Sequence, residues 1–158
     1  MKNTFRFCVA AGLLGFLFAG AAMGQKSGAG LGIILGEPTG IDGKFWLSNR
    51  TAFDAAVAWS TEGDEHFVFQ GDFVFHNFNV LKRAFEVRRG DLPLYYGVGA
   101  RLRTHRHEEF GIRFVAGLAY IFPTAPFDLF LEVAPIMNLI HETELDGSAA
   151  IGFRFWFK

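Results

Sequence analysis

The feature that most constrains the fold of this chain is a two-residue alternation of apolar and other side chains that recurs along most of its length. Each alternating segment has about 8 to 13 residues and is bounded by clusters of Gly, Pro, Asn, Asp or Ser, as expected for β-strands joined by turns. Helical periodicity is absent from residue 25 onward. The sequence therefore predicts eight strands, at residues 28–36, 41–48, 51–60, 66–77, 93–103, 110–122, 127–138 and 145–157.

Phenylalanine marks one face of these strands. In the segment 67–75 the odd positions are Phe, Phe, Gly, Phe and Phe, whereas the even positions are Val, Gln, Asp and Val. The chain has 20 phenylalanines; four lie in the first 24 residues, which leaves 16, and 13 of those fall on the apolar set. The exceptions are Phe130, on the opposite set, and Phe78 and Phe85, in a connector.

The charged residues of the strands all fall on the opposite set, where the other members are mostly Gly and Ala. They are Asp42, Lys44, Asp54, Asp72, Arg101, Arg103, Arg113, Asp128, Glu132, Asp146 and Arg154. A soluble sheet would present a face dense in Lys, Glu, Thr and Ser to water. Small residues with isolated charges instead suit the narrow interior of a barrel whose apolar face is turned to lipid, where the charges must pair.

Closure of the sheet follows from the same reasoning, because an open edge in hydrocarbon would leave backbone groups without partners. A strand crosses a bilayer in about 9–11 residues, so eight strands need about 80 residues and fit this chain. The fold predicted is all-β, an eight-stranded antiparallel up-and-down transmembrane β-barrel. Six aromatic residues lie mostly toward strand ends, where an interfacial girdle would sit: Trp46, Trp59, Tyr95, Tyr96, Tyr120 and Trp156. Trp46, Tyr95 and Trp156, however, are on the inward set.

Nine of the strand charges form the predicted lumen network, to which we assign a structural role. They are Asp42, Lys44, Asp54, Asp72, Arg101, Arg113, Asp128, Glu132 and Arg154.

The N-terminal region has the order of a secretory signal peptide. Two basic residues precede an uncharged apolar run at 7–19, and small residues follow it, so we expect residues 1–24 to be a signal peptide and 25–158 the barrel domain. The only cysteine, Cys8, lies within the apolar run, so a disulfide or a thiol nucleophile is not expected.

With these features the chain resembles the small eight-stranded outer-membrane barrels of the OmpA-transmembrane and OmpX sort. The ending with Phe153, Phe155 and Phe157 resembles the aromatic C-terminal signal that the barrel-assembly machinery recognises, with Lys158 as a departure from it. The resemblance implies a bacterial outer-membrane location, contact with outer-membrane lipid and lipopolysaccharide, and a monomer.

With both termini in the periplasm, one connector conflicts with the usual arrangement. The longest connector, 78–92, would be on the inner side, whereas the outer loops of such barrels are the longer ones. Either the fourth and fifth strands extend beyond the membrane through Val80-Leu81 and 85–87, or the orientation is inverted. The sequence leaves both open.

Other functions fit the sequence less well. A nucleic-acid binder is not expected, because 15 Lys and Arg against 16 Asp and Glu leave no basic excess. Four histidines near acidic residues at the outer rim could hold a divalent cation, but they lack the fixed spacing of a structural zinc site: His66, His105, His107 and His141. A lipid A-modifying enzyme would need a serine beside a histidine, and Ser60 with His66 or His76 is a poor match. We expect no catalytic, metal or cofactor residues; a small pore or ligand-binding barrel and a soluble periplasmic lipocalin-like barrel remain as alternatives.

Overall fold

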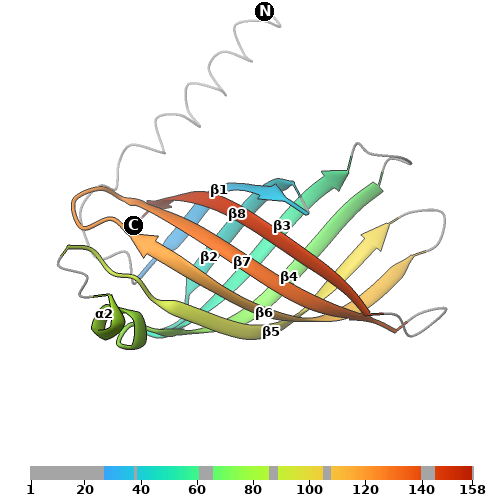
Figure 1. The fold of residues 1–158 in the computed structure, drawn as a ribbon. Coiled ribbons are helices and arrows are strands. Elements are labelled where there is room, and N and C mark those ends of the chain that lie inside the picture. Colours follow the sequence, from blue (N-terminus) through green and yellow to red (C-terminus); the bar gives the residue numbers. More distant parts are fainter. Residues whose placement is uncertain are drawn as a thin grey trace, which may run out of the picture.

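The computed structural model describes residues 27–37, 39–60, 66–85, 89–104, 108–139 and 145–157. Within these ranges, eight antiparallel strands pair in chain order and close into one barrel (Figure 1). The predicted fold class, an eight-stranded up-and-down barrel, is confirmed. The strands are β1 (Ala29–Gly36), β2 (Gly40–Trp46), β3 (Thr51–Ser60), β4 (His66–Asn77), β5 (Leu94–Thr104), β6 (Glu109–Ile121), β7 (Phe127–Asn138) and β8 (Leu145–Phe157), and a short helix, α2 (Val80–Ala84), lies between β4 and β5.

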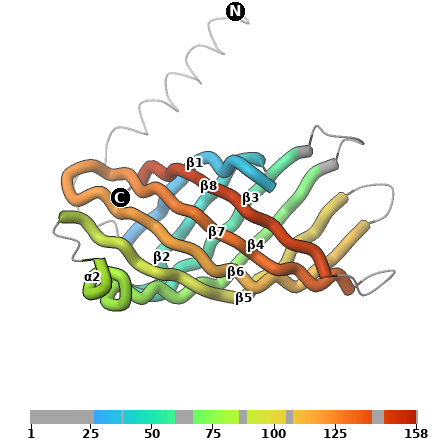
Figure 2. The backbone as a smooth tube through the Cα atoms, viewed as in Figure 1, coloured from blue at the N-terminus to red at the C-terminus, as the bar shows by residue number. Residues whose placement is uncertain are grey.

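Closure is made by the first and last strands. The β1–β8 ladder runs from Ala29 opposite Phe157 to Gly36 opposite Ala150. Figure 2 shows the strands tilted across the barrel wall, with α2, the β6–β7 turn and the end of β8 at one end of the barrel. None of the helices in the described part of the chain has the length and apolar character to traverse a bilayer.

Strand ends differ from the prediction by two residues or fewer. The largest difference is in β2, which stops at Trp46 because a tight turn begins directly after it. The amides of Leu47 and Ser48 both donate to the Thr51 carbonyl, and the Thr51 amide donates to the Ser48 hydroxyl. A polar side chain that bonds nearby backbone groups competes with strand pairing. This explains why the strand ends before residue 48, where the alternation predicted its end.

The predicted apolar set faces outward and the opposite set faces inward. In β4, for example, Phe67 is 55% exposed, whereas Val68 and Asp72, both on the opposite set, are buried. The same holds in β8, where Ile151 is exposed and Arg154 is fully buried. The polarity of this barrel is therefore opposite to that of a water-soluble protein.

Large inward side chains lie opposite glycines on the neighbouring strand. Tyr95 pairs in register with Gly117, and Phe130 pairs with Gly152. A Cβ atom on either glycine would overlap the facing aromatic ring. Placing a large residue opposite a small one in this way fills a narrow barrel without overlap.

Three of the six aromatic residues near strand ends do not belong to a girdle. Trp46, Tyr95 and Trp156 point inward and are buried. The Trp46 ring lies 4.4 Å from the ring of His76 and 6.0 Å from that of Trp156, so these side chains fill one end of the interior. Their place in the alternation predicted that they face the interior, and it was a better guide than their position near a strand end.

The proposed extension of β4 is wrong, because Val80 and Leu81 lie in α2. The proposed extension of β5 through 85–87 lies largely outside the described residues. The strand pattern ends at Asn77, whose side-chain oxygen accepts from the amides of Asn79 and Val80 and turns the chain into α2. Phe78 packs against the interior cluster, whereas Phe85 is 69% exposed.

Replacing the interior glycine Gly152 by alanine should lower the free energy of unfolding by about 1–3 kcal/mol, because the new methyl group overpacks against Phe130. The outward-facing Gly43 is the matched control, since a Cβ there would have its nearest neighbour at 3.7 Å. Urea unfolding of both alanine variants in the same detergent measures the difference. Equal stability of the two variants would contradict this packing argument.

Candidate functional site in the barrel interior

The nine residues of the predicted network all point into the barrel. None is more than 6% exposed, and they come from seven of the strands. They are Asp42 and Lys44 on β2, Asp54 on β3, Asp72 on β4, Arg101 on β5, Arg113 on β6, Asp128 and Glu132 on β7, and Arg154 on β8. Five are carboxylates and four are basic, so the buried formal charge nearly cancels.

Arg154 is the centre of the larger group, and its guanidinium faces three carboxylates. Its Nε bonds Asp42, its Nη2 lies 3.1 Å from Asp54 Oδ2, and its Nη1 lies 3.8 Å from Asp128 Oδ2. The guanidinium also lies 3.7 Å from the ring centroid of Phe130, a cation–π geometry. Because a planar guanidinium has five N–H donors, one arginine can bridge carboxylates on three different strands.

Lys44 connects this group to the aromatic end of the interior. Its Nζ lies 3.0 Å from Asp54 Oδ2 and 3.5 Å from His76 Nε2. The same ammonium lies 4.6 Å from the ring centroid of Tyr95. A lysine this deeply buried is compatible with folding because a carboxylate and an aromatic face replace the water it loses.

Arg113 forms a second group with Asp72 and Glu132. Its Nε lies 3.2 Å from Asp72 Oδ1, and its Nη2 lies 2.9 Å from Glu132 Oε1. The Tyr95 hydroxyl donates to the other oxygen of Glu132 at 3.0 Å. Tyr95 therefore joins the two groups, since its ring faces Lys44 and its hydroxyl bonds Glu132.

Arg101 stands apart from the other eight residues. Its Nη2 lies 2.6 Å from Asp146 Oδ2 and donates to the Asn138 side chain at 3.3 Å. Arg103 adds contacts with the same aspartate at 3.7 Å and with Glu109 at 3.3 Å. These pairs lie at the barrel end opposite α2 and are partly exposed, so they form a rim cluster separate from the deep network.

Several participants in the deep network were missed because they are not formally charged. Tyr95 bonds Glu132, the Trp156 indole N–H donates to Asp128 at 2.9 Å, and His76 contacts Lys44. Their inward phase was visible in the sequence. Which carboxylate each one reaches depends on strand register and tilt, which the alternation does not specify.

The histidine and serine hypotheses find no support in the described residues. Within those ranges, no group of three or more His, Cys, Asp or Glu could hold a metal ion. Residues 105–107 and 141, and the side chains of Ser60 and His66, lie outside the description. Ser60 pairs with His66 at one end of the β3–β4 ladder, whereas His76 lies beyond the opposite end, about 30 Å away at the usual strand rise.

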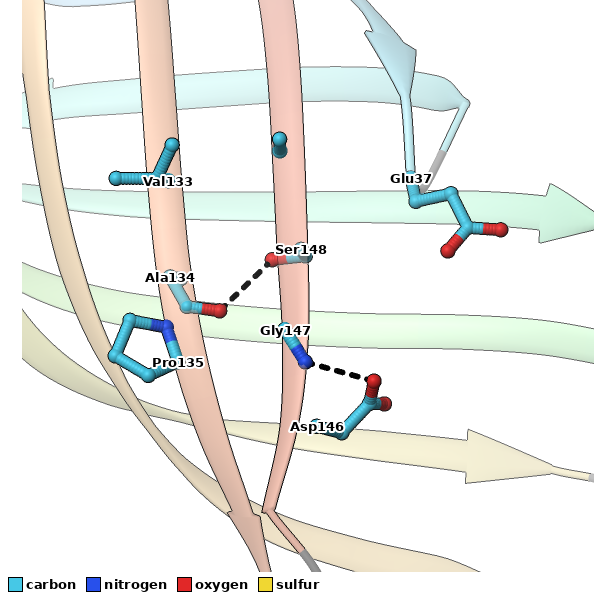
Figure 3. Close-up of a pocket in the computed structure, with 8 residues that line it drawn as sticks. Glu37, Val133, Ala134, Pro135, Asp146, Gly147 and Ser148 are labelled. Carbon is cyan, nitrogen blue, oxygen red and sulfur yellow. Dashed lines mark hydrogen bonds between the residues drawn. The ribbon is translucent and has the colours of Figure 1, made fainter.

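A shallow depression of about 530 Å³ lies where β8 runs past the end of β1. Figure 3 shows Glu37 across from Ser148, whose hydroxyl donates to the Ala134 carbonyl, and the Gly147 amide bonded to Asp146. The Glu37 amide donates to the Ala149 carbonyl at 3.0 Å. The strand edge left beyond β1 is thus partly capped by the protein itself. The lining residues are Glu37, Val133, Ala134, Pro135, Asp146, Gly147, Ser148 and Ala149.

These features define a small closed antiparallel barrel with an apolar outer surface and a charged interior. The fold is similar to that of a solved structure, the N-terminal β-barrel domain of OprF from Pseudomonas aeruginosa, with a TM-score of 0.63. The two chains are 13% identical, and the match covers 82% of this chain and 96% of that one. No protein-family profile and no curated protein sequence matches this chain. At this identity the likeness establishes a shared fold.

Replacing Arg154 by methionine should lower the free energy of unfolding by about 3–5 kcal/mol, because three buried carboxylates lose their shared cation. The control Arg103→Met, at the partly exposed rim, should cost about 1 kcal/mol or less. Adding Asp42→Asn to Arg154→Met should recover part of the loss. Equal effects at the two arginines in urea titrations would contradict the network.

Proposed function

We propose that this protein is an integral outer-membrane β-barrel with a structural or interaction role, exported to the outer membrane and inserted there as a monomer. The observation that carries the proposal is the outward apolar surface, which includes large side chains on every strand. Examples on four of the strands are Leu31 at 50%, Phe53 at 47%, Phe114 at 52% and Leu131 at 52% exposed.

A soluble periplasmic barrel is a poor account of this surface. Soluble monomers rarely expose a continuous apolar patch of more than a few hundred Å². Here the apolar side chains follow one another around a closed wall, and the charges that would keep such a barrel in solution are buried. In hydrocarbon an apolar outer wall is favourable, and charges are best kept inside the barrel, away from lipid.

The proposed lumen is a filled interior that holds the barrel together and does not conduct ions. Eight-stranded barrels are just wide enough for side chains to fill. The contacts of Arg154 and Arg113 engage the interior carboxylates, and the rings of Trp46, His76 and Trp156 occupy one end. This supports the structural role over the alternative of a pore or ligand-binding barrel.

In the proposed orientation the end that carries α2 and the C-terminal residue of β8 faces the periplasm. Phe153, Phe155 and Phe157 stand on the outward set near that end, and the Phe155 and Phe157 ring centroids are 5.0 Å apart. An outward aromatic row on the last strand is accessible before closure, and this supports its proposed role as the signal for the barrel-assembly machinery. Lipopolysaccharide would then surround the opposite end.

Placing arginine at Leu131, near the middle of β7, should destabilise the bilayer-inserted barrel by about 2–4 kcal/mol, because the charge would enter the hydrocarbon core. The same change at Leu139, just past the end of β7, should cost about 0–1 kcal/mol. Reversible unfolding in lipid vesicles measures both. A soluble protein would tolerate the two substitutions equally, and that result would contradict the proposal.

Cell fractionation and electrophoresis test the location and the filled lumen together. The protein should be recovered with outer membranes, and the unboiled sample should migrate differently from the boiled one. Planar bilayers containing the purified barrel should show no discrete conductance steps. Recovery as a soluble periplasmic monomer would overturn the barrel proposal, whereas conductance steps would overturn only the filled lumen.

A further inference from the structure

The connector between β4 and β5 carries a group of basic side chains at one end of the barrel. Lys82 and Arg83 lie on α2, and Arg89 follows it; all three are exposed. Lys82 lies 3.7 Å from Asp91, with half of its side chain still exposed. No carboxylate among the described residues forms an ion pair with Arg83 or Arg89. This end therefore presents cationic groups that the described part of the chain does not neutralise.

The last residues of the connector, from Arg89 to Asp91, are held by the end of β6. The Tyr120 hydroxyl donates to the Arg89 carbonyl at 3.3 Å, and Asp91 and Ile121 exchange backbone hydrogen bonds of 3.1 and 2.8 Å. Gly90 has φ of +75°, and a Cβ there would lie 2.7 Å from the Ile121 carbonyl oxygen, so a larger residue would hinder this approach. Tyr120 is on the outward set of β6, and its hydrogen bond holds the Arg89 backbone close to the end of that strand.

Two apolar side chains accompany the basic group. Val80 is 49% exposed and Phe85 is 69% exposed, the highest value among the described phenylalanines. Both lie outside the strands, so the alternation that turns the wall toward lipid does not account for them. Exposed apolar residues next to basic ones are the composition of a segment that lies in a membrane interface.

We propose that the described parts of this connector, the α2 anchor (residues 80–85 and 89–91), bind the phosphate groups of anionic phospholipids in the leaflet at this end of the barrel. The inference rests on the barrel spanning a membrane. Lys82, Arg83 and Arg89 supply the charge that attracts the headgroup, and Val80 and Phe85 insert beside the acyl chains. The complementary charge favours an anionic lipid over a neutral one of the same chain length.

Lipid retention by the folded barrel tests this proposal. The full protein, folded in detergent, is titrated with phosphatidylglycerol or with phosphatidylcholine of the same acyl chains, and bound lipid is counted by native mass spectrometry. The wild type should retain phosphatidylglycerol preferentially. The variant Lys82→Gln/Arg83→Gln/Arg89→Gln should lose at least about tenfold of that preference, since each basic residue near an anionic surface contributes about fivefold.

Two further variants separate charge from structure. Arg103→Gln removes a basic side chain from the opposite rim and should keep the preference. Phe85→Ala should weaken retention of both lipids and leave their ratio unchanged, because it removes apolar contact only.

The possible failures are distinguishable. A barrel that shows no heat-dependent gel shift would overturn the membrane proposal and this one with it. A folded barrel without a phosphatidylglycerol preference, or a triple variant that retains it, would overturn the α2 anchor alone. Displacement of bound lipid by equimolar glycerol phosphate would show a site for soluble phosphate and would also overturn it.

Discussion

Closure of the sheet is the constraint on which the rest of this structure depends. The β1–β8 ladder pairs the two edges that a linear chain of hairpins would leave open. In the proposed membrane setting this pairing is required, because hydrocarbon holds no water to bond an unpaired amide or carbonyl. The ladder covers all of β1 but only part of β8, and beyond Gly36 the edge is protected by local bonds such as that from Gly147 to Asp146. Because β1 is short, part of β8 has no β1 residue paired with it.

Closing with eight strands makes the interior narrow, and this narrowness explains the unusual residues inside. Some aromatic rings lie opposite glycine, as Tyr95 does opposite Gly117, where a Cβ would overlap the ring. Charged groups deprived of water must find partners within a few Å, and Arg154 and Arg113 provide them from positions on two different strands. Glycine and ion pairs are therefore consequences of one geometric limit.

Most of the wall could be read from the sequence, because in a strand the side-chain period is two and each residue's face follows from its neighbour's. That logic placed Asp42, Asp128 and Arg154 inside without error. It failed where the period stops: the α2 helix begins when the Asn77 side chain captures two amides, an event that alternation does not encode. For Tyr95 and Trp156 two signals conflicted: their position near a strand end suggested an interfacial girdle, whereas their place in the alternation indicated the interior, where both lie.

By itself the sequence determined which residues face outward and which face the interior, since that depends only on local alternation along each strand. Tertiary structure decided which interior residues meet. Asp42 and Arg154 are 112 residues apart and Tyr95 and Glu132 are 37 apart, and their contacts arise from register, tilt and closure acting together. Those quantities are set by pairing between whole strands, so no single segment of the sequence contains them.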